Sequence, residues 1–337
     1  MAWFGRLFGR DGAAGPSLRP APELAVTWAA TTKTVRSANL GDALSPVIVA
    51  ALSGRRVRHA HFDEDVERIA ALGTIGQDLH GGILHLWGTG AQRRLWPVDG
   101  EGRPRHPGGI FHVHATRGPL TRAVLRDAGI EAPEVYGDPA LLLPRLFPMT
   151  PEPVHDLGII PHVSELDAVS PDARPKADIL RYRIPPEMAG RVRLIPTWTL
   201  AEPAALFACI RRILSCRRII STSLHGLVIA EAFGIPALAL GKKGRGATAW
   251  DLTGPCDGLD HRMIDYGLGS GRTRLTTYAR RPVNETDWAD AIAAVDRFAR
   301  PPEFDPEPLL AAFPFKGEGA GPIDVAALPG HIAEIRL

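Results

Sequence analysis

The chain is poor in several features that mark particular protein classes. Its three cysteines, Cys209, Cys216 and Cys256, are odd in number and form no C-x-x-C pair, which argues against a disulfide framework or a cysteine-based zinc site and fits a reducing compartment. The formal net charge is only +2, so no overall electrostatic attraction to nucleic acid is expected. No apolar run is long enough to span a membrane. We therefore expect a cytoplasmic protein that does not bind nucleic acid.

What the chain does contain is typical of a globular enzyme. Its 337 residues are 45% hydrophobic and 23% charged, enough to bury a large core, and two domains are the natural expectation. Only five of its 39 basic residues are lysines. Arginine dominates, and its guanidinium is well suited to bidentate binding of anions.

The first 23 residues are expected to form a flexible tail. Residues 1–10 combine bulky apolar side chains with arginines, a composition suited to a weak peripheral contact with an anionic inner membrane face. The apolar region is too short for a signal peptide. A disordered tail is the favoured alternative, because Gly12 to Pro22 has the composition of a linker.

From Leu24 onward, short apolar runs alternate with amphipathic stretches, which predicts strands followed by helices. Pro119 opens one such helix, since proline suits a first helical position. Strands are expected at 24–30, 57–60, 110–115, 157–161, 192–196, 218–220 and 236–240, and helices at 43–52, 119–128, 203–214, 224–233 and 288–298.

This alternation predicts an α/β protein with parallel sheets covered by helices on both faces. The proline-rich stretch from Pro144 to Pro153 indicates a domain boundary. We expect Rossmann-like domains at 24–150 and 151–300, whose sheets face a central cleft, and a C-terminal extension at 301–337. In such folds the carboxyl ends of the strands face the ligand.

The segment from Arg218 to Leu240 is the most informative part of the chain. An apolar run leads into Ser221, Thr222 and Ser223, then into an apolar helical stretch with His225 in its first turn. Hydroxyl residues at this point are expected to cap the helix, and a helix N-terminus after a strand suits an anion. His225 would lie beside that anion as a proton-transfer group, or it would be a structural histidine.

Three other segments have two interpretations each. Asp42, after Asn39 and Gly41 at the first strand–helix turn, is either a general base or a helix N-cap. Arg117, before Gly-Pro and followed by Arg122, either binds a carboxylate or phosphate or lies at the surface. The segment from Gly241 to Gly246, which carries Lys242, Lys243 and Arg245, either closes over an anion or is a solvated loop.

No metal site is predicted. His112 and His114 lie on one face of an expected strand, but no third ligand is evident nearby. Asp63 and Asp65 form a D-x-D spacing, but they precede an apparently helical stretch, where acidic residues favour the helix N-terminus.

Six motifs in this order resemble the polysaccharide pyruvyl transferase family, in particular the bacterial exopolysaccharide ketal-pyruvate transferases. The resemblance extends from about residue 39 to 270. The motifs are Asn39-x-Gly41-Asp42, Arg117-Gly-Pro-Leu-Thr-Arg122, Tyr136-Gly-Asp138-Pro, Gly158-Ile-Ile-Pro161-His162, Ser221-Thr-Ser-Leu-His225-Gly and Asp265-Tyr266.

The resemblance implies a GT-B-like fold, phosphoenolpyruvate as the donor, a lipid-linked sugar diol as the acceptor, and no metal or other cofactor. It implies a functional role for His225 and a donor-binding role for Arg117. The reaction also needs proton transfers, which we expect His225 to share with Asp42 or Asp138. Some members have arginine two residues before the histidine, where this chain has Ser223. A donor cation must therefore come from elsewhere, and Lys242, Lys243 and Arg245 are the candidates.

Two rival functions remain open at the level of sequence. Glu231-Ala-Phe-Gly234-Ile-Pro236 resembles the element with which GT-B glycosyl transferases hold a nucleotide sugar. A non-catalytic glycan-binding homologue would keep the same fold with a degenerate site, although the presence of His225, Arg117 and Asp42 argues against it.

Overall fold

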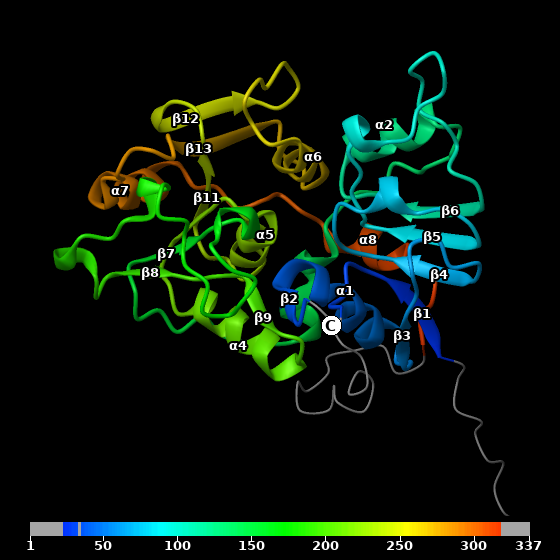
Figure 1. Cartoon of the computed structure of the whole chain (residues 1–337), viewed down its shortest axis with the longest axis horizontal. Coiled ribbons are helices and arrows are strands. Elements are labelled where there is room, and N and C mark those ends of the chain that lie inside the picture. The colour runs from blue at the N-terminus through cyan, green and yellow to red at the C-terminus, as the bar shows by residue number, and fades with distance from the viewer. Residues whose placement is uncertain (1–22, 33–34, 318–337) are drawn as a thin grey trace, which may run out of the picture.

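Most of the strands form two large sheets, each built from one half of the chain (Figure 1). The computed structural model describes residues 23–32 and 35–317. The first sheet is wholly parallel, with strand order β3-β1-β4-β5-β6. Its strands are β1 (Leu24–Thr27), β3 (Val57–His59), β4 (Glu67–Ala70), β5 (Ile83–Trp87) and β6 (Ile110–Ala115).

The second sheet has the order β12-β13-β11-β10-β7-β8 and is parallel except for β12, which runs antiparallel at one edge. The α/β class and the parallel strands expected from the sequence are thus confirmed. The strands are β7 (Leu157–Ile160), β8 (Val192–Leu194), β10 (Ile219–Ser221), β11 (Ala237–Gly241), β12 (Arg245–Asp251) and β13 (Arg274–Arg280).

Helices cover both faces of each sheet. The outer face of the first sheet packs on α2 (Pro119–Asp127), and that of the second on α7 (Trp288–Phe298). The remaining helices are α1 (Leu40–Ser53), α3 (Leu143–Leu146), α4 (Pro203–Leu214), α5 (Leu224–Ala232), α6 (His261–Gly269) and α8 (Pro306–Ala311).

The large hydrophobic cluster between the two sheets runs from one half of the chain into the other. Helix α1, which follows β2 (Ser37–Asn39), packs against α4 and α5 of the second half, between the two sheets (Figure 1). Cys209 and Cys216 are buried in this core and unpaired, so they pack as small apolar residues. Two further strands, β2 (Ser37–Asn39) and β9 (Trp198–Leu200), pair antiparallel between the halves.

The chain returns to the first sheet after it completes the second. Helix α8 and the residues after it pack beside β5, where the indole of Trp87 donates a hydrogen bond to the carbonyl of Leu309 (2.8 Å) and its ring meets Phe313 edge-on. The first part of the predicted C-terminal extension therefore completes the N-terminal half. Residues 318–337 and the predicted tail at 1–22 lie outside the described residues.

Candidate functional site

Helix α5 begins directly after β10, but its hydroxyl residues do not cap it. Ser223 occupies the N-cap position without a side-chain capping bond. The hydroxyl of Ser221 is fully buried and donates to the carbonyl of Ser223 (2.6 Å), and that of Thr222 donates to Glu165 (2.7 Å). The expected capping role is therefore wrong, because these hydroxyls are used to fix the loop itself.

His225 lies in the first turn of α5 and points toward the N-terminal half. Its ring packs on Gly41 so closely that a Cβ at that position would lie 1.8 Å from Nδ1. Its Nε2 lies 3.6 Å from Oδ2 of Asp138, beyond hydrogen-bond distance, and this buried nitrogen has no hydrogen-bond partner among the described residues. A buried nitrogen without a hydrogen-bond partner costs free energy. A hydrogen-bonding group of a ligand would remove that cost.

Asp42 joins His225 from the first turn of α1. The helix begins at Leu40 rather than at Ala43, so Asn39 is the N-cap and the capping interpretation of Asp42 is wrong. The Asn39 side-chain amide donates to Asp42 (2.8 Å). Burial raises the pKa of Asp42, although His225, Asn39 and Arg262 partly offset this effect. Asp42 thus retains a proton to higher pH than an ordinary aspartate.

Asp138 approaches from the third side. It is the N-cap of a short 3-10 helix, η3 (Pro139–Leu142), and its Oδ1 accepts the backbone N–H of Ala140 (3.0 Å). Its other oxygen faces His225. The structure therefore brings together the three residues that the sequence assigned to proton transfer, from three segments far apart in the chain.

A pocket of about 370 Å³ opens at the carboxyl ends of β7, β10 and β11. His162, Thr222 and Lys242 line it just after these three strands, as expected for ligand sites of parallel sheets. Arg262 of α6 and Arg94 of the first half complete its cationic lining. Arg262 also acts electrostatically on Asp42, which relates the pocket to the group formed by His225, Asp42 and Asp138, although none of these three residues lines it.

Asp260 fixes Arg262 in the pocket wall. Asp260 is the N-cap of α6 and accepts both the backbone N–H (2.9 Å) and the Nη2 of Arg262 (2.7 Å). Burial alone would raise the pKa of Asp260, but the hydrogen bonds and charge of Arg262 outweigh it and lower that pKa to about 2. Arg262 was not predicted; the available signal was an aspartate two residues before an arginine, ahead of the Asp265-Tyr266 motif.

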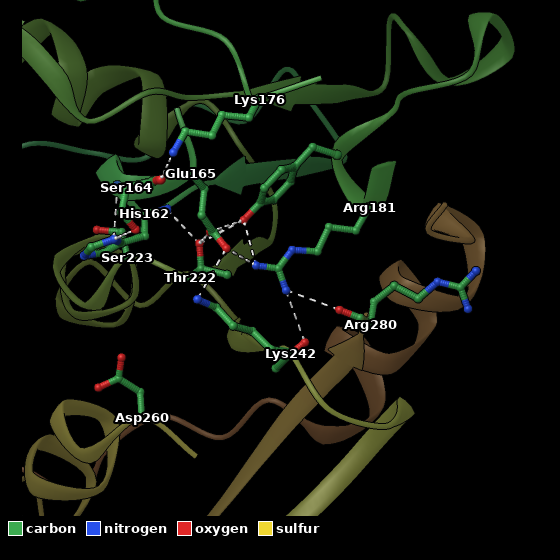
Figure 2. A network of polar contacts seen from close by, with 12 residues as sticks. His162, Ser164, Glu165, Lys176, Arg181, Thr222, Ser223, Lys242, Asp260 and Arg280 are labelled. Carbon is green, nitrogen blue, oxygen red and sulfur yellow. Dashed lines mark hydrogen bonds and ion pairs between the residues drawn. The ribbon is translucent and has the colours of Figure 1, made fainter. Parts of the chain in front are cut away.

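Behind the pocket lies a buried polar network that the sequence did not predict (Figure 2). Glu165 pairs with the fully buried Arg181 (2.5 Å) and accepts hydrogen bonds from Thr222 and Tyr182 (2.7 Å each). Lys242 turns its ammonium toward Glu165 (3.6 Å). Burial would raise the pKa of Glu165, but Arg181 and these hydrogen bonds lower it, so a stable carboxylate anchors the pocket floor.

Arg117 is placed differently from the sequence expectation. It is 1% exposed and forms a buried ion pair with Asp265 of α6 (3.1 Å), while its Nη1 donates to Thr74 (2.7 Å). Asp265 also accepts the backbone N–H groups of Leu120 and Thr121 (3.0 and 3.1 Å). It therefore caps α2 from the other half of the chain. In this structure Arg117 joins the two halves and does not line the pocket.

Three of the other predicted cations, Arg122, Lys243 and Arg245, also lie outside the pocket lining. Arg122 pairs with Glu134 (3.0 Å) at the surface of α2. Lys243 packs beside Gly258, and Arg245 is an exposed residue of the edge strand β12. The expectation of a loop over residues 241–246 is corrected, since both ends of that segment belong to strands. Lys242 alone of the three candidate replacements lines the pocket.

Within residues 23–32 and 35–317, no group of three or more histidine, cysteine or acidic side chains is placed to hold a metal ion. Nε2 of His114 lies 2.9 Å from Nδ1 of His85, and the ring of His112 stacks on that of His85. Asp63 and Asp65 precede strand β4, so the expected helix there is wrong. Among the described helices, none is long and apolar enough to cross a membrane.

Comparison with known proteins adds two similarities. A protein of Acanthamoeba polyphaga mimivirus, described as "Uncharacterized protein L143", is 30% identical over 126 residues, which is 36% of this chain and 39% of that protein. No solved structure matches the chain, so the GT-B-like arrangement stays a prediction.

The second similarity is to a protein family. The matched segment begins just before β6, ends just after β11, and includes Asp138, His162, His225 and Lys242. Through residues 108–243 the chain matches the family model of the polysaccharide pyruvyl transferases, and the resemblance inferred from its motifs is confirmed over that segment.

Proposed function

We propose that this protein transfers the enolpyruvyl group of phosphoenolpyruvate to two hydroxyls of a sugar, forming a cyclic pyruvate ketal on an exopolysaccharide or its lipid-linked precursor. The observation that carries the proposal is the unpaired Nε2 of His225, next to two aspartates and a cation-lined pocket. The family match over 108–243 supports it. No metal ion, cofactor or nucleic acid is needed.

The reaction requires proton transfers that this group of residues can perform. The enol carbon of the donor gains a proton, and one sugar hydroxyl adds to the neighbouring carbon. The second hydroxyl then adds to the same carbon while the carbon–oxygen bond to phosphate breaks. The two sugar hydroxyls release two protons. One replaces the proton that the donor's methylene carbon took up to become a methyl group, and the other leaves with phosphate. Asp42, which holds its proton to higher pH, suits the acid, and His225, whose Nε2 faces Asp138 without a hydrogen bond to it, suits the base.

The pocket suits the charge of the donor. Phosphoenolpyruvate carries a phosphate and a carboxylate, and Arg94, Lys242 and Arg262 supply positive charge from three separate elements. Lys242 and Arg262 take the place of the arginine that some family members carry at the position of Ser223.

Transfer of a glycosyl group from a nucleotide sugar is less well supported. Glu231, the residue that would hold the nucleotide sugar, is buried and accepts hydrogen bonds from Tyr266 (2.5 Å) and Arg272 (2.7 Å). Both carboxylate oxygens are therefore already used inside the protein.

A donor comparison tests the proposal. Purified protein is incubated with a lipid-linked oligosaccharide and either phosphoenolpyruvate or UDP- and GDP-sugars, with EDTA present, while ³¹P NMR follows the donor. We expect phosphoenolpyruvate to be consumed and inorganic phosphate to appear. Consumption of a nucleotide sugar would favour glycosyl transfer, and binding of glycan with no donor consumed would favour a non-catalytic role.

A further inference from the structure

His162 lines the pocket but has no role in the function proposed above. It follows β7 directly, and its backbone N–H donates to Thr222 (2.7 Å), which fixes the start of its side chain. The Nδ1 atom lies 2.7 Å from the hydroxyl of Ser164, and Nε2 lies 3.2 Å from Nη1 of Arg262. Glu165, Asp260 and Lys242 are the other charged groups that act on the ring.

The contact between His162 and Arg262 restricts the hydrogens on the ring. A guanidinium nitrogen only donates hydrogen bonds, so Nε2 must accept in the free protein. The ring is then neutral with its hydrogen on Nδ1, donated to Ser164. Burial, followed by the charge of Arg262, lowers the pKa of His162 and favours the neutral ring. Meanwhile the backbone N–H of Ser164, 3.3 Å from Nδ1, faces a nitrogen that cannot accept from it.

An acceptor ligand between the two side chains would remove this conflict. Nη1 of Arg262 and Nε2 of His162 would both donate to the ligand once Nε2 carries a hydrogen. If the hydrogen moves from Nδ1 to Nε2, Nδ1 becomes able to accept from Ser164. An anion would also favour a doubly protonated ring, which donates from Nε2 as well.

The geometry favours phosphate over carboxylate as the anion. Arg262 already directs Nε and Nη2 at Asp260 (3.1 and 2.7 Å), so one of the two bidentate edges of its guanidinium is occupied. The donors left for a ligand come from separate elements: the Nη1 side of Arg262, Nε2 of His162 and Nζ of Lys242. Donors that converge from three directions suit the tetrahedral oxygens of a phosphate.

We propose that His162 and Arg262 form a clamp for the phosphoryl group of the donor, in which Nε2 of His162 changes from acceptor to donor when the phosphate binds. This inference rests on the proposed function for the identity of the donor, but the clamp itself can be tested with inorganic phosphate alone.

The test combines ¹⁵N NMR of the histidine side chains with calorimetry. On titration of wild-type protein with inorganic phosphate, we expect the ¹⁵N signal of His162 Nε2 to move from the range of an unprotonated to that of a protonated nitrogen. We expect phosphate affinity to fall at least tenfold in His162→Leu and less in His162→Gln, whose amide can still donate. His106→Gln, a change at an exposed histidine outside the pocket, should bind phosphate as the wild type does.

Three results would overturn the clamp: an unmoved Nε2 signal at saturating phosphate, wild-type phosphate affinity in His162→Leu, or a signal that responds to pyruvate rather than phosphate. If His162→Leu fails to fold, the wild-type NMR titration still decides. If the clamp fails these tests but phosphoenolpyruvate is still consumed, the proposed function stands without the clamp. If His162 responds to phosphate but phosphoenolpyruvate is not turned over, the clamp is supported and the proposed function is contradicted.

Discussion

His225 is more deeply buried than its position at a helix start predicts, with 9% of its surface exposed. Truncation to alanine would leave a cavity, so His225→Gln is the better probe of its chemistry, since glutamine keeps hydrogen-bonding ability but cannot exchange a proton at neutral pH. We expect turnover of phosphoenolpyruvate to fall by roughly a hundredfold to ten-thousandfold with an unchanged melting temperature. Near-normal turnover would assign the proton transfers to Asp42 and Asp138 instead.

Gly41 has no room for a side chain next to His225. Because a Cβ there would lie 1.8 Å from Nδ1, Gly41→Ala must displace the imidazole. Misplacement of a reacting group by about 1 Å costs on the order of a hundredfold in rate, and we expect a loss of that size in kcat. Gly190→Ala is the matched control, because nothing lies within 4 Å of a Cβ at that position. Equal activity of the two variants would contradict the placement of His225.

Arg117 gives opposite results under its two interpretations. As half of a buried ion pair with Asp265, its replacement in Arg117→Met leaves a buried charge unpaired, and the free energy of unfolding should fall by about 3–5 kcal/mol. The double variant with Asp265→Asn, which removes the unpaired charge but keeps an oxygen to accept from Leu120 and Thr121, should regain part of that loss in urea unfolding. A variant with normal stability but weak phosphoenolpyruvate binding would instead restore the donor-binding role.

Asp260 affects function through the start of α6. Loss of an N-cap costs about 0.5–2 kcal/mol, and Asp260→Ala should also release Arg262 from the pocket wall and raise the KM for phosphoenolpyruvate several-fold. Asp287 is the N-cap of α7, and its side chain accepts the backbone N–H of Asp290. Asp287→Ala should therefore cost similar stability with no change in KM. If both variants shift KM alike, the effect belongs to general destabilisation.

Regular elements were predictable from sequence where local signals suffice. The bounds expected for β6, α4 and α7 agree with the structure. The two helices were predictable because a clear apolar period coincides with a proline or an aspartate at the helix start. Strand β2 was not predictable, since it has three residues and pairs with a strand about 160 positions away. Helix α6, which supplies Arg262, was missed because its apolar pattern is short and interrupted by glycines.

The site itself was predictable in part. His225, Asp42 and Asp138 were identified from motifs, and the structure brings them together. The sequence could not show that Arg117 finds its partner in Asp265, 148 residues later. A local pattern identifies a residue with the right chemistry, but its partner depends on which distant element packs against it.

For the molecule as a whole, the shared core predicts that both halves respond to one ligand. Phosphoenolpyruvate at about one hundred times its dissociation constant should stabilise the folded state by roughly 2.7 kcal/mol. Because the core is continuous across the halves, we expect a single melting transition that moves as one in differential scanning calorimetry. UDP- and GDP-sugars should leave it unmoved; a shift with them and none with phosphoenolpyruvate would transfer the assignment to glycosyl transfer.

The contact of Trp87 with Leu309 has a consequence for synthesis on the ribosome. The two residues are 222 positions apart. At about 5–20 residues per second, the ribosome needs roughly ten to forty-five seconds to supply the second after the first. Throughout that interval the nascent first sheet lacks the segment that packs beside Trp87. The first half is thus made early but completed late, and the exposed apolar surface around Trp87 is where a chaperone would be expected to bind the growing chain.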